Sequence, residues 1–339
     1  MEKKTISWIN YVRVICMFLV YFHHTENRIH FDFLDRSFDV YYKPFFVNAF
    51  FVVSGYLLYK KQEQIYQSVK STRLWFNEFG KKYLSNILFT LVVPSIIFSL
   101  ILFFPKILLR HQEFDASTLL EHTIGGGSLW FVSALAVAQL LIFVPLFFRK
   151  ISLTIWGGVG VICLVTAILL HKAGYENFPW YYQSGLCAVF FIWFGSLIYK
   201  IEHFLFFHLK VLWIMLFVCY SVVIYFVHPV VNIGYVKLNL QGFLLCLMSS
   251  LILIAFCSWL KPNKFVDKIG TSTIGLYFLS GGVPEIVAMT ANRFVVLNDF
   301  LFVIVVIISF FAAIILNELI RKYAYFLFDL RKIWYYVSH

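Results

Sequence analysis

The sequence predicts an all-α, polytopic membrane protein, and three observations indicate this class. Hydrophobic residues make up 61% of the chain, charged residues 13%, and the mean hydropathy is +0.82. A soluble globule of this composition would expose far too much apolar surface to water. Ten apolar runs have about the length of a membrane span, and the charges lie mainly between them. Because the net charge of +11 is carried by these connections, we expect no nucleic-acid partner.

The ten runs follow one another without an internal repeat. They lie near residues 7 to 24, 44 to 59, 83 to 105, 128 to 148, 151 to 170, 183 to 199, 205 to 228, 238 to 260, 271 to 290 and 295 to 317. No small-residue cleavage site follows the first run, so we interpret it as a retained helix. The longest connections are about 20 residues, too short for an independent core. We therefore expect one integral-membrane domain over residues 1–339.

The distribution of Lys and Arg predicts the orientation of this helix bundle in the plasma (inner) membrane. The N-terminus, the C-terminal tail and the even-numbered connections together carry 19 of the 28 basic residues, and the opposite side carries 8. Basic residues are enriched in cytoplasmic connections. Both termini are therefore predicted to be cytoplasmic.

The first run contains ionisable residues that are costly in a membrane helix. Arg13 and His24 are eleven residues apart, so on a helix they share one face at a separation of about 16 Å. His23 lies about 80° away from Arg13 around the same helix. Each ionisable group costs roughly 2.5 to 3.5 kcal/mol at the centre of a membrane helix. The spacing therefore favours a site lined by Arg13 and His24.

A structural role for these residues is the alternative. The two histidines would then mark the point where the helix leaves the membrane, and Arg13 would extend to the inner headgroups. The spacing leaves both interpretations open.

The second run and the connection that follows it contain further polar residues. Asn48, Ser54 and Gly55 interrupt an aromatic run, which is typical of a helix-packing face or a cavity wall. The next connection is the most basic of the chain and includes Arg73, Lys81 and Lys82. These cations either set the topology or bind a phosphorylated cofactor at the cytoplasmic side.

The fourth and ninth runs contribute the remaining candidates for cavity-lining residues. Trp130 follows three glycines at the start of the fourth run, where a tryptophan is typical of the membrane interface. Tyr277, Ser280 and Glu285 lie in the ninth run, and Glu285 is an acid at membrane depth. Gly281, Gly282 and Pro284 predict a bend or break in that helix, and broken helices often border a cavity.

The six cysteines predict no metal or redox centre. All of them fall inside apolar runs, as expected of small buried hydrophobic residues. We therefore expect neither a metal ion nor a disulfide framework.

Five motifs together resemble the membrane acyltransferase family 3. They occur in the family's order across nearly the whole chain: Arg13 with His24 after ten residues, Phe-Phe-x-x-Ser-Gly-x-Leu at 50–57, Leu-Trp-Phe at 129–131, Phe-Phe-x-x-x-Gly at 190–195 and Gly-x-Ser-x-Ile-Gly-Leu-Tyr at 270–277. The resemblance implies an integral-membrane O-acyltransferase. It would take acetyl groups from acetyl-CoA and place them on hydroxyls of extracytoplasmic or lipid-linked glycans, such as capsule, O-antigen, exopolysaccharide or peptidoglycan.

The resemblance also implies roles for particular residues. Arg13 and His24 match the family's functional pair. The chain departs from the family at two places: Ser280 stands where the ninth-helix motif commonly ends in His, and Lys81 and Lys82 stand at the usually arginine-rich start of the third helix. These departures concern the donor contacts and the identity of the acyl group.

The chemistry of acyl transfer leads to the same candidates. A sugar hydroxyl is a poor nucleophile, and a neutral histidine can remove its proton near pH 7. We therefore expect His24 to be the base, acting by direct transfer or through an acyl-histidine. Coenzyme A is anionic, so the donor should enter from the basic cytoplasmic side and contact Arg13, Arg73, Lys81 and Lys82.

Two other functions are compatible with ten helices and a broken ninth helix. A transporter or flippase for a glycan or lipid-linked substrate would also need polar groups near the midplane, although no inverted repeat is visible. A non-catalytic membrane scaffold is the third hypothesis. The sequence indicates no particular oligomeric state.

Overall fold

The computed structural model is helical, with no strand among the residues that it describes. These residues are 6–26, 41–68, 71–111, 113–147, 153–175, 179–207, 210–227, 240–295, 298–331 and 333. Each of the ten predicted apolar runs falls on a helix or a series of short helices. The predicted class, an all-α polytopic membrane protein, is confirmed.

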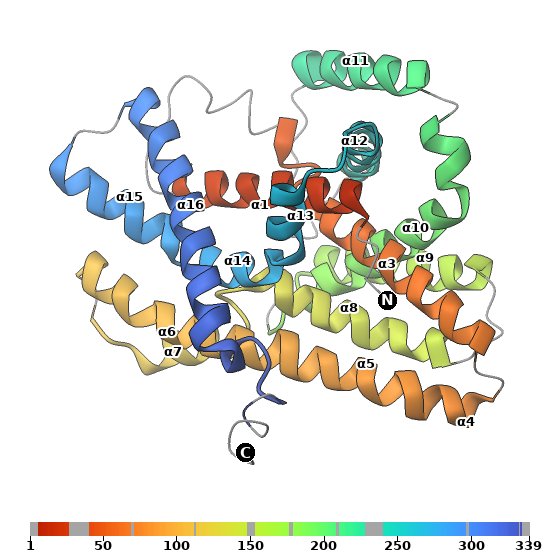
Figure 1. Cartoon of the computed structure of the whole chain (residues 1–339), viewed down its shortest axis with the longest axis horizontal. Helices are drawn as coiled ribbons and strands as arrows, with labels where there is room; N and C mark the ends of the chain where they lie inside the picture. The colour runs from red at the N-terminus through yellow and green to blue at the C-terminus, as the bar shows by residue number, and fades with distance from the viewer. Residues whose placement is uncertain are drawn as a thin grey trace.

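Eight α-helices lie in the described part of the first half of the chain. They are α1 (Ser7–Glu26), α3 (Asn48–Ser68), α4 (Thr72–Trp75), α5 (Lys81–Asn86), α6 (Val93–Arg110), α7 (Ala116–His122), α8 (Trp130–Phe147) and α9 (Leu153–Lys172). The second half contributes α10 (Tyr182–Phe207), α11 (Lys210–Val227), α12 (Leu240–Ser258), α13 (Lys264–Thr271), α14 (Thr273–Ser280), α15 (Val283–Phe294) and α16 (Asp299–Tyr323). In Figure 1, α1 passes through the middle of the molecule, and it contacts α3, α12, α13, α14, α15 and α16.

Five helical stretches of the described chain are long and apolar enough to cross a membrane. They are Arg73–Arg110, Trp130–Phe147, Leu153–Lys172, Tyr182–Glu202 and Asp299–Tyr323. If α14 and α15 are counted as one span, they form a sixth candidate crossing, because together they are long and apolar enough. The chain bends by 49° between them. The break lies at Gly281 and Gly282, so the predicted interruption of the ninth run is confirmed.

The third run is longer than its sequence pattern predicts. The structure continues the helix from Arg73 to Arg110 over 38 residues, and α3 extends to Ser68. The described residues of the expected connection, 60 to 82, are therefore largely helical. Its Lys, Glu and Gln residues favour helix, and the burial of Trp75 holds this helix against its neighbours. Two π-helical turns, η1 (Phe76–Gly80) and η2 (Ile87–Val92), interrupt the rod. Pro94 has no N–H group and so cannot donate a helical backbone hydrogen bond. The wider π-helical turn η2, which ends just before Pro94, suits this missing hydrogen bond.

Ring contacts show how α1 is aligned with its neighbours. Along α1 and α16, Phe18 stacks edge-on against Phe310 at 5.5 Å, and Phe22 against Phe302 at 5.1 Å. Tyr21 also lies edge-on to Phe310, at 5.4 Å, so rings within about one turn of α1 contact both Phe302 and Phe310 of α16. The two helices cross each other, as Figure 1 shows.

The helix pair α13–α14 runs parallel to α1. Asn10 donates a hydrogen bond to Asp267 at 2.8 Å, and the Tyr21 hydroxyl donates to the carbonyl of Leu276 at 2.8 Å. Both partner numbers rise along α1. Three residues beyond Tyr21, His24 is therefore level with about residue 280, where α14 ends and the break begins.

Candidate functional site

A cavity of about 310 Å³ lies beside the middle of α1. Its wall is built from α1, α3, η2, α8, α14, α16 and the segment after α16, and Arg13 is among the lining residues. We call it the Arg13 cavity. Thr90 and Leu91 reach it from the π-helical turn η2, so the irregular part of the long rod faces this space.

The guanidinium of Arg13 has no protein partner in the described part of the chain. No hydrogen bond or ion pair joins it to a described residue, and its surroundings act on it only by removing water. A guanidinium carries five donors and a permanent charge, and leaving these uncompensated inside a helix bundle is costly. Arg13 is thus suited to bind an anionic or carbonyl group that enters the cavity.

The Arg13 cavity is also charged at the end formed by the last turn of α16 and the segment that follows it. Arg321, in the last turn of α16, lines it, as does Asp329 in the segment that follows. Arg321 makes a hydrogen bond to Asn317 at 3.4 Å and lies over the ring of Phe328.

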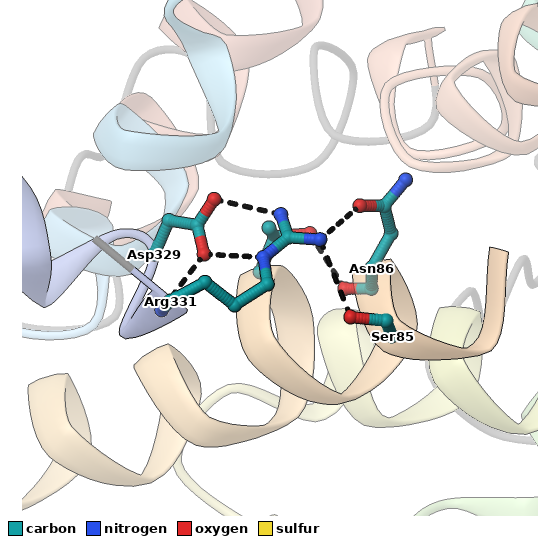
Figure 2. Close-up of polar contacts among 5 residues, drawn as sticks. Ser85, Asn86, Asp329 and Arg331 are labelled. Carbon is teal, nitrogen blue, oxygen red and sulfur yellow. Dashed lines mark hydrogen bonds and ion pairs between the residues drawn. The ribbon is translucent and has the colours of Figure 1, made fainter. Parts of the chain in front are cut away.

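The segment after α16 is fastened across this end of the cavity by Arg331 (Figure 2). Arg331 donates two hydrogen bonds of 2.7 Å to the carboxylate of Asp329 and one of 2.8 Å to Asn86 on α5. A longer bond of 3.3 Å reaches Ser85. The bonds with Asp329 raise the pKa of Arg331, which keeps this connection charged. The wall of the Arg13 cavity therefore depends on contact between the segment after α16 and the long rod.

Aromatic side chains from α3, α8 and α14 also line the Arg13 cavity. Phe50 of α3 and Phe131 of α8 lie with their ring centroids 5.6 Å apart, and Phe131 is 5.0 Å from Tyr277 of α14. The Tyr277 hydroxyl accepts a hydrogen bond of 3.3 Å from the Phe131 backbone. Ser54 lines the same wall, although its hydroxyl donates to the Phe50 carbonyl. The wall of the cavity thus combines charged side chains with aromatic rings.

His24 is not among the described residues that line the Arg13 cavity. It is half-buried on α1, with its ring centroid 6.0 Å from that of His23. Because α1 is helical from Ser7 to Glu26, the predicted common face and the separation of about 16 Å from Arg13 follow from helix geometry. His24 thus lies level with the break between α14 and α15, beyond the aromatic side chains of the cavity wall.

The other predicted site residues have different positions. Asn48 is buried, and its side chain bonds to the Pro44 carbonyl. Trp130 packs against Tyr181. Ser280 is buried, and its hydroxyl donates a hydrogen bond to the Tyr277 carbonyl. Glu285 forms an ion pair with Arg110 of α6 at 2.6 Å. None of these four lines the Arg13 cavity within the described structure.

Arg73, Lys81 and Lys82 lie on the exposed surface of the long rod, outside the residues described around the Arg13 cavity. Their role in donor binding stays a prediction. Arg321 and Asp329 were not predicted, because charges at the end of the last helix are also typical of an ordinary basic cytoplasmic tail. The hydrogen bond between Arg331 and Asn86, which brings this segment to the cavity, is visible only in the fold.

The family comparison agrees with this arrangement. The structure defines an integral-membrane protein with a buried, cation-lined cavity beside a broken helix. The sequence model described as an acyltransferase domain, acyltransferase family 3, matches residues 6–318 of the 339-residue chain, so the chain belongs to this family of membrane acyltransferases. No curated protein and no solved structure matches the chain. Membership of the family favours an enzyme over a transporter or a scaffold.

Proposed function

We propose that this protein is an O-acetyltransferase of the plasma (inner) membrane. It takes the acetyl group from cytoplasmic acetyl-CoA and transfers it to a hydroxyl of an extracytoplasmic or lipid-linked glycan. The observation that carries the proposal is Arg13, a guanidinium inside the bundle that faces a cavity and has no partner among the described residues.

The charged end and the aromatic side chains of the Arg13 cavity suit the two ends of acetyl-CoA. The phosphates of the nucleotide would lie near Arg321, and Asp329 is already occupied by Arg331. The uncharged thioester arm would extend past Arg13 toward Phe50, Phe131 and Tyr277. With both termini cytoplasmic, the charged end opens on the side where acetyl-CoA is found.

His24 is the proposed general base. Its imidazole takes the proton of the acceptor hydroxyl as the hydroxyl oxygen forms a bond with the acetyl carbonyl carbon. The carbon–sulfur bond breaks, the electron pair leaves on the coenzyme A sulfur, and the imidazolium returns the proton to that sulfur. The products are the acetyl ester and free coenzyme A. The level of His24, beyond the aromatic side chains of the cavity wall, suits a base that meets the thioester at the tip of the donor.

Donor truncation tests this assignment. Acetyl-pantetheine keeps the thioester but lacks the nucleotide phosphates. We expect Arg13→Ala to weaken both acetyl-CoA and acetyl-pantetheine binding by roughly 10- to 100-fold, the usual value of a hydrogen bond to a charged group. Arg13→Lys should retain part of the affinity because it keeps the charge but loses the planar fork. Arg321→Gln should weaken acetyl-CoA alone.

Calorimetric titration of each donor into equal amounts of folded protein gives these affinities. Lys268→Gln is the matched control, because Lys268 is an exposed cation that pairs with Glu318 of α16 away from the cavity. Unchanged affinity and turnover in Arg13→Ala would remove Arg13 from the donor site and make it a headgroup anchor.

A further inference from the structure

A second cavity, of about 320 Å³, lies at the other end of the long rod. It is enclosed by α6, α7 and the turn before α8, and we call it the Arg110 cavity. Lys106 lines it, whereas Thr90 of the same rod lines the Arg13 cavity. Sixteen residues of helix separate these two positions by about 24 Å. With the termini cytoplasmic, the Arg110 cavity opens toward the non-cytoplasmic side.

The inner wall of the Arg110 cavity presents unused donors. The Nε atom of Arg110 donates to Glu285 at 2.6 Å, and Lys106 lies 3.8 Å from the same carboxylate. Neither Nη atom of Arg110 has a hydrogen-bond partner within the described chain. The Arg110 side chain is only 27% exposed, and that of Glu285 is 9% exposed. Glu285 thus holds the guanidinium of Arg110 in place. The two Nη groups of that guanidinium form a fork that remains available to a planar anion.

His122 reports the electrostatic environment of this wall. Its pKa is lowered first by burial and then by the charges of Lys106 and Arg110, against the opposing effect of Glu121. A neutral imidazole between two cations offers both a donor and an acceptor.

The rim of the cavity carries carboxylates, which accept hydrogen bonds, instead of cationic donors. Asp115 caps α7 and accepts hydrogen bonds from Ser117 and Thr118, which lower its pKa and keep it ionised. Asp115 and Glu113 are exposed, so solvent screens their charges from the inner wall. Phe103 contributes a ring next to His122. Half-buried cationic donors, rim acceptors and an aromatic face suit a ligand with several hydroxyls and one anionic group.

Only a short partition separates the two cavities. Ser128 lines the Arg110 cavity and Phe131, three residues later, lines the Arg13 cavity. A methyl group added to Gly281, at the break after α14, would contact Leu129 at 3.0 Å and Ser128 at 3.8 Å. His24 is level with this same break. A hydroxyl in one cavity and a thioester in the other would therefore approach each other at the height of His24.

We propose that the Arg110 cavity is the acceptor site, and that it selects an acidic sugar whose carboxylate or phosphate binds the free fork of Arg110. The inference rests on the proposed acyl transfer, since it assigns the second substrate of that reaction. Lys106 adds to the attraction for the anion, and the rim carboxylates accept hydrogen bonds from the sugar hydroxyls.

Saturation-transfer NMR on the full chain in detergent tests this proposal with glucuronate, glucose 6-phosphate and neutral glucose as probes. We expect at least one acidic sugar to bind roughly tenfold more tightly than glucose, a typical value for one charge-assisted pair. The better acidic probe identifies the anionic group as a carboxylate or a phosphate. Arg110→Lys, which keeps a charge for Glu285 but loses the fork, should abolish most of this preference.

Arg293→Gln is the matched control, because Arg293 is an exposed arginine in the last turn of α15 and lies outside both cavities. Equal binding of glucose and both acidic sugars, or an unchanged preference in folded Arg110→Lys protein, would overturn the proposal. Acetyl-CoA affinity, measured on the same samples, should be unaffected by Arg110→Lys. Loss of donor binding in the wild-type protein would contradict the proposed function instead, without changing the sugar result.

Discussion

The adjacent histidines at the end of α1 differ in their surroundings. The Nδ1 atom of His23 lies 3.2 Å from the hydroxyl of Tyr42, which itself donates to Glu26 at 2.9 Å. His23 therefore belongs to a polar cluster that joins α1 to the turn before α3. His24 lies on the face of α1 that carries Arg13, as helix geometry requires. The two rings can be distinguished by substitution.

We expect His24→Ala to abolish acetyl transfer and His23→Ala to retain most of it. The first change removes the proposed base, whereas the second removes a contact that stabilises the end of α1. Wild-type activity should also fall on acidification, because a protonated imidazole cannot accept the hydroxyl proton. Radiolabelled acetyl-CoA turnover, normalised to the amount of folded protein in the membrane, measures both effects. Equal losses in the two variants would show that position on the helix face does not decide the role.

The sequence could predict Arg13, Ser54 and Tyr277 as lining residues of the cavity, but not the charged residues Arg321 and Asp329. A charged residue in an apolar helix is costly wherever that helix packs, so Arg13 was visible without the fold. Arg321 and Asp329 carry no such signal, because charges at the end of a last helix also serve topology. Glu285 was recognised as unusual, yet its pairing with Arg110 joins positions 175 residues apart and needed the tertiary structure.

At the level of elements, α3 and α10 approach each other through two glycines. A methyl group added at Gly55 would overlap the backbone carbonyl of Ile192, and one at Gly195 would overlap that of Val52. Backbone contact of this kind requires small residues on both helices. Of the two roles that the sequence leaves open for Gly55, a packing face or a cavity wall, the contact with α10 shows packing. The contact fixes the position of Ser54 on the wall of the Arg13 cavity.

Gly195→Ala should therefore destabilise the protein. Overpacking a rigid contact costs about 1–3 kcal/mol, so we expect a clear drop in the melting temperature in detergent. Gly158→Ala in α9 is the control, because an added methyl there meets nothing within 4 Å and alanine favours helix by about 0.5–1 kcal/mol. A melting temperature of Gly195→Ala equal to or above that of Gly158→Ala would contradict the packing argument.

Helix boundaries were predicted less well than helix interruptions. Two glycines and a proline weaken a helix locally, so the break between α14 and α15 was visible in the sequence. The start of the long rod was missed because its charged residues resemble a loop in hydropathy, although Trp75 is fully buried between the helices. Polar helix that extends beyond the membrane has no hydropathy signal.

For the whole molecule, the orientation in the membrane decides which substrate can reach each of the two cavities. The structure contains no membrane, so the side itself follows from the 19 to 8 distribution of basic residues. This assignment has chemical consequences. In the proposed function, this orientation would expose the Arg13 cavity to cytoplasmic acetyl-CoA and the Arg110 cavity to an extracytoplasmic acceptor.

Reporter fusions test the orientation directly. Green fluorescent protein fused after the C-terminal tail should fluoresce, because it folds in the cytoplasm. Alkaline phosphatase inserted after Gly174 should be active, because that turn between α9 and α10 is predicted to be outside and a side chain at Gly174 meets nothing within 4 Å. An active phosphatase at the C-terminal tail, together with an inactive one at Gly174, would invert the bundle. Arg321 would then face the outside, where cytoplasmic acetyl-CoA cannot reach it, and the two cavities would have to exchange their proposed substrates.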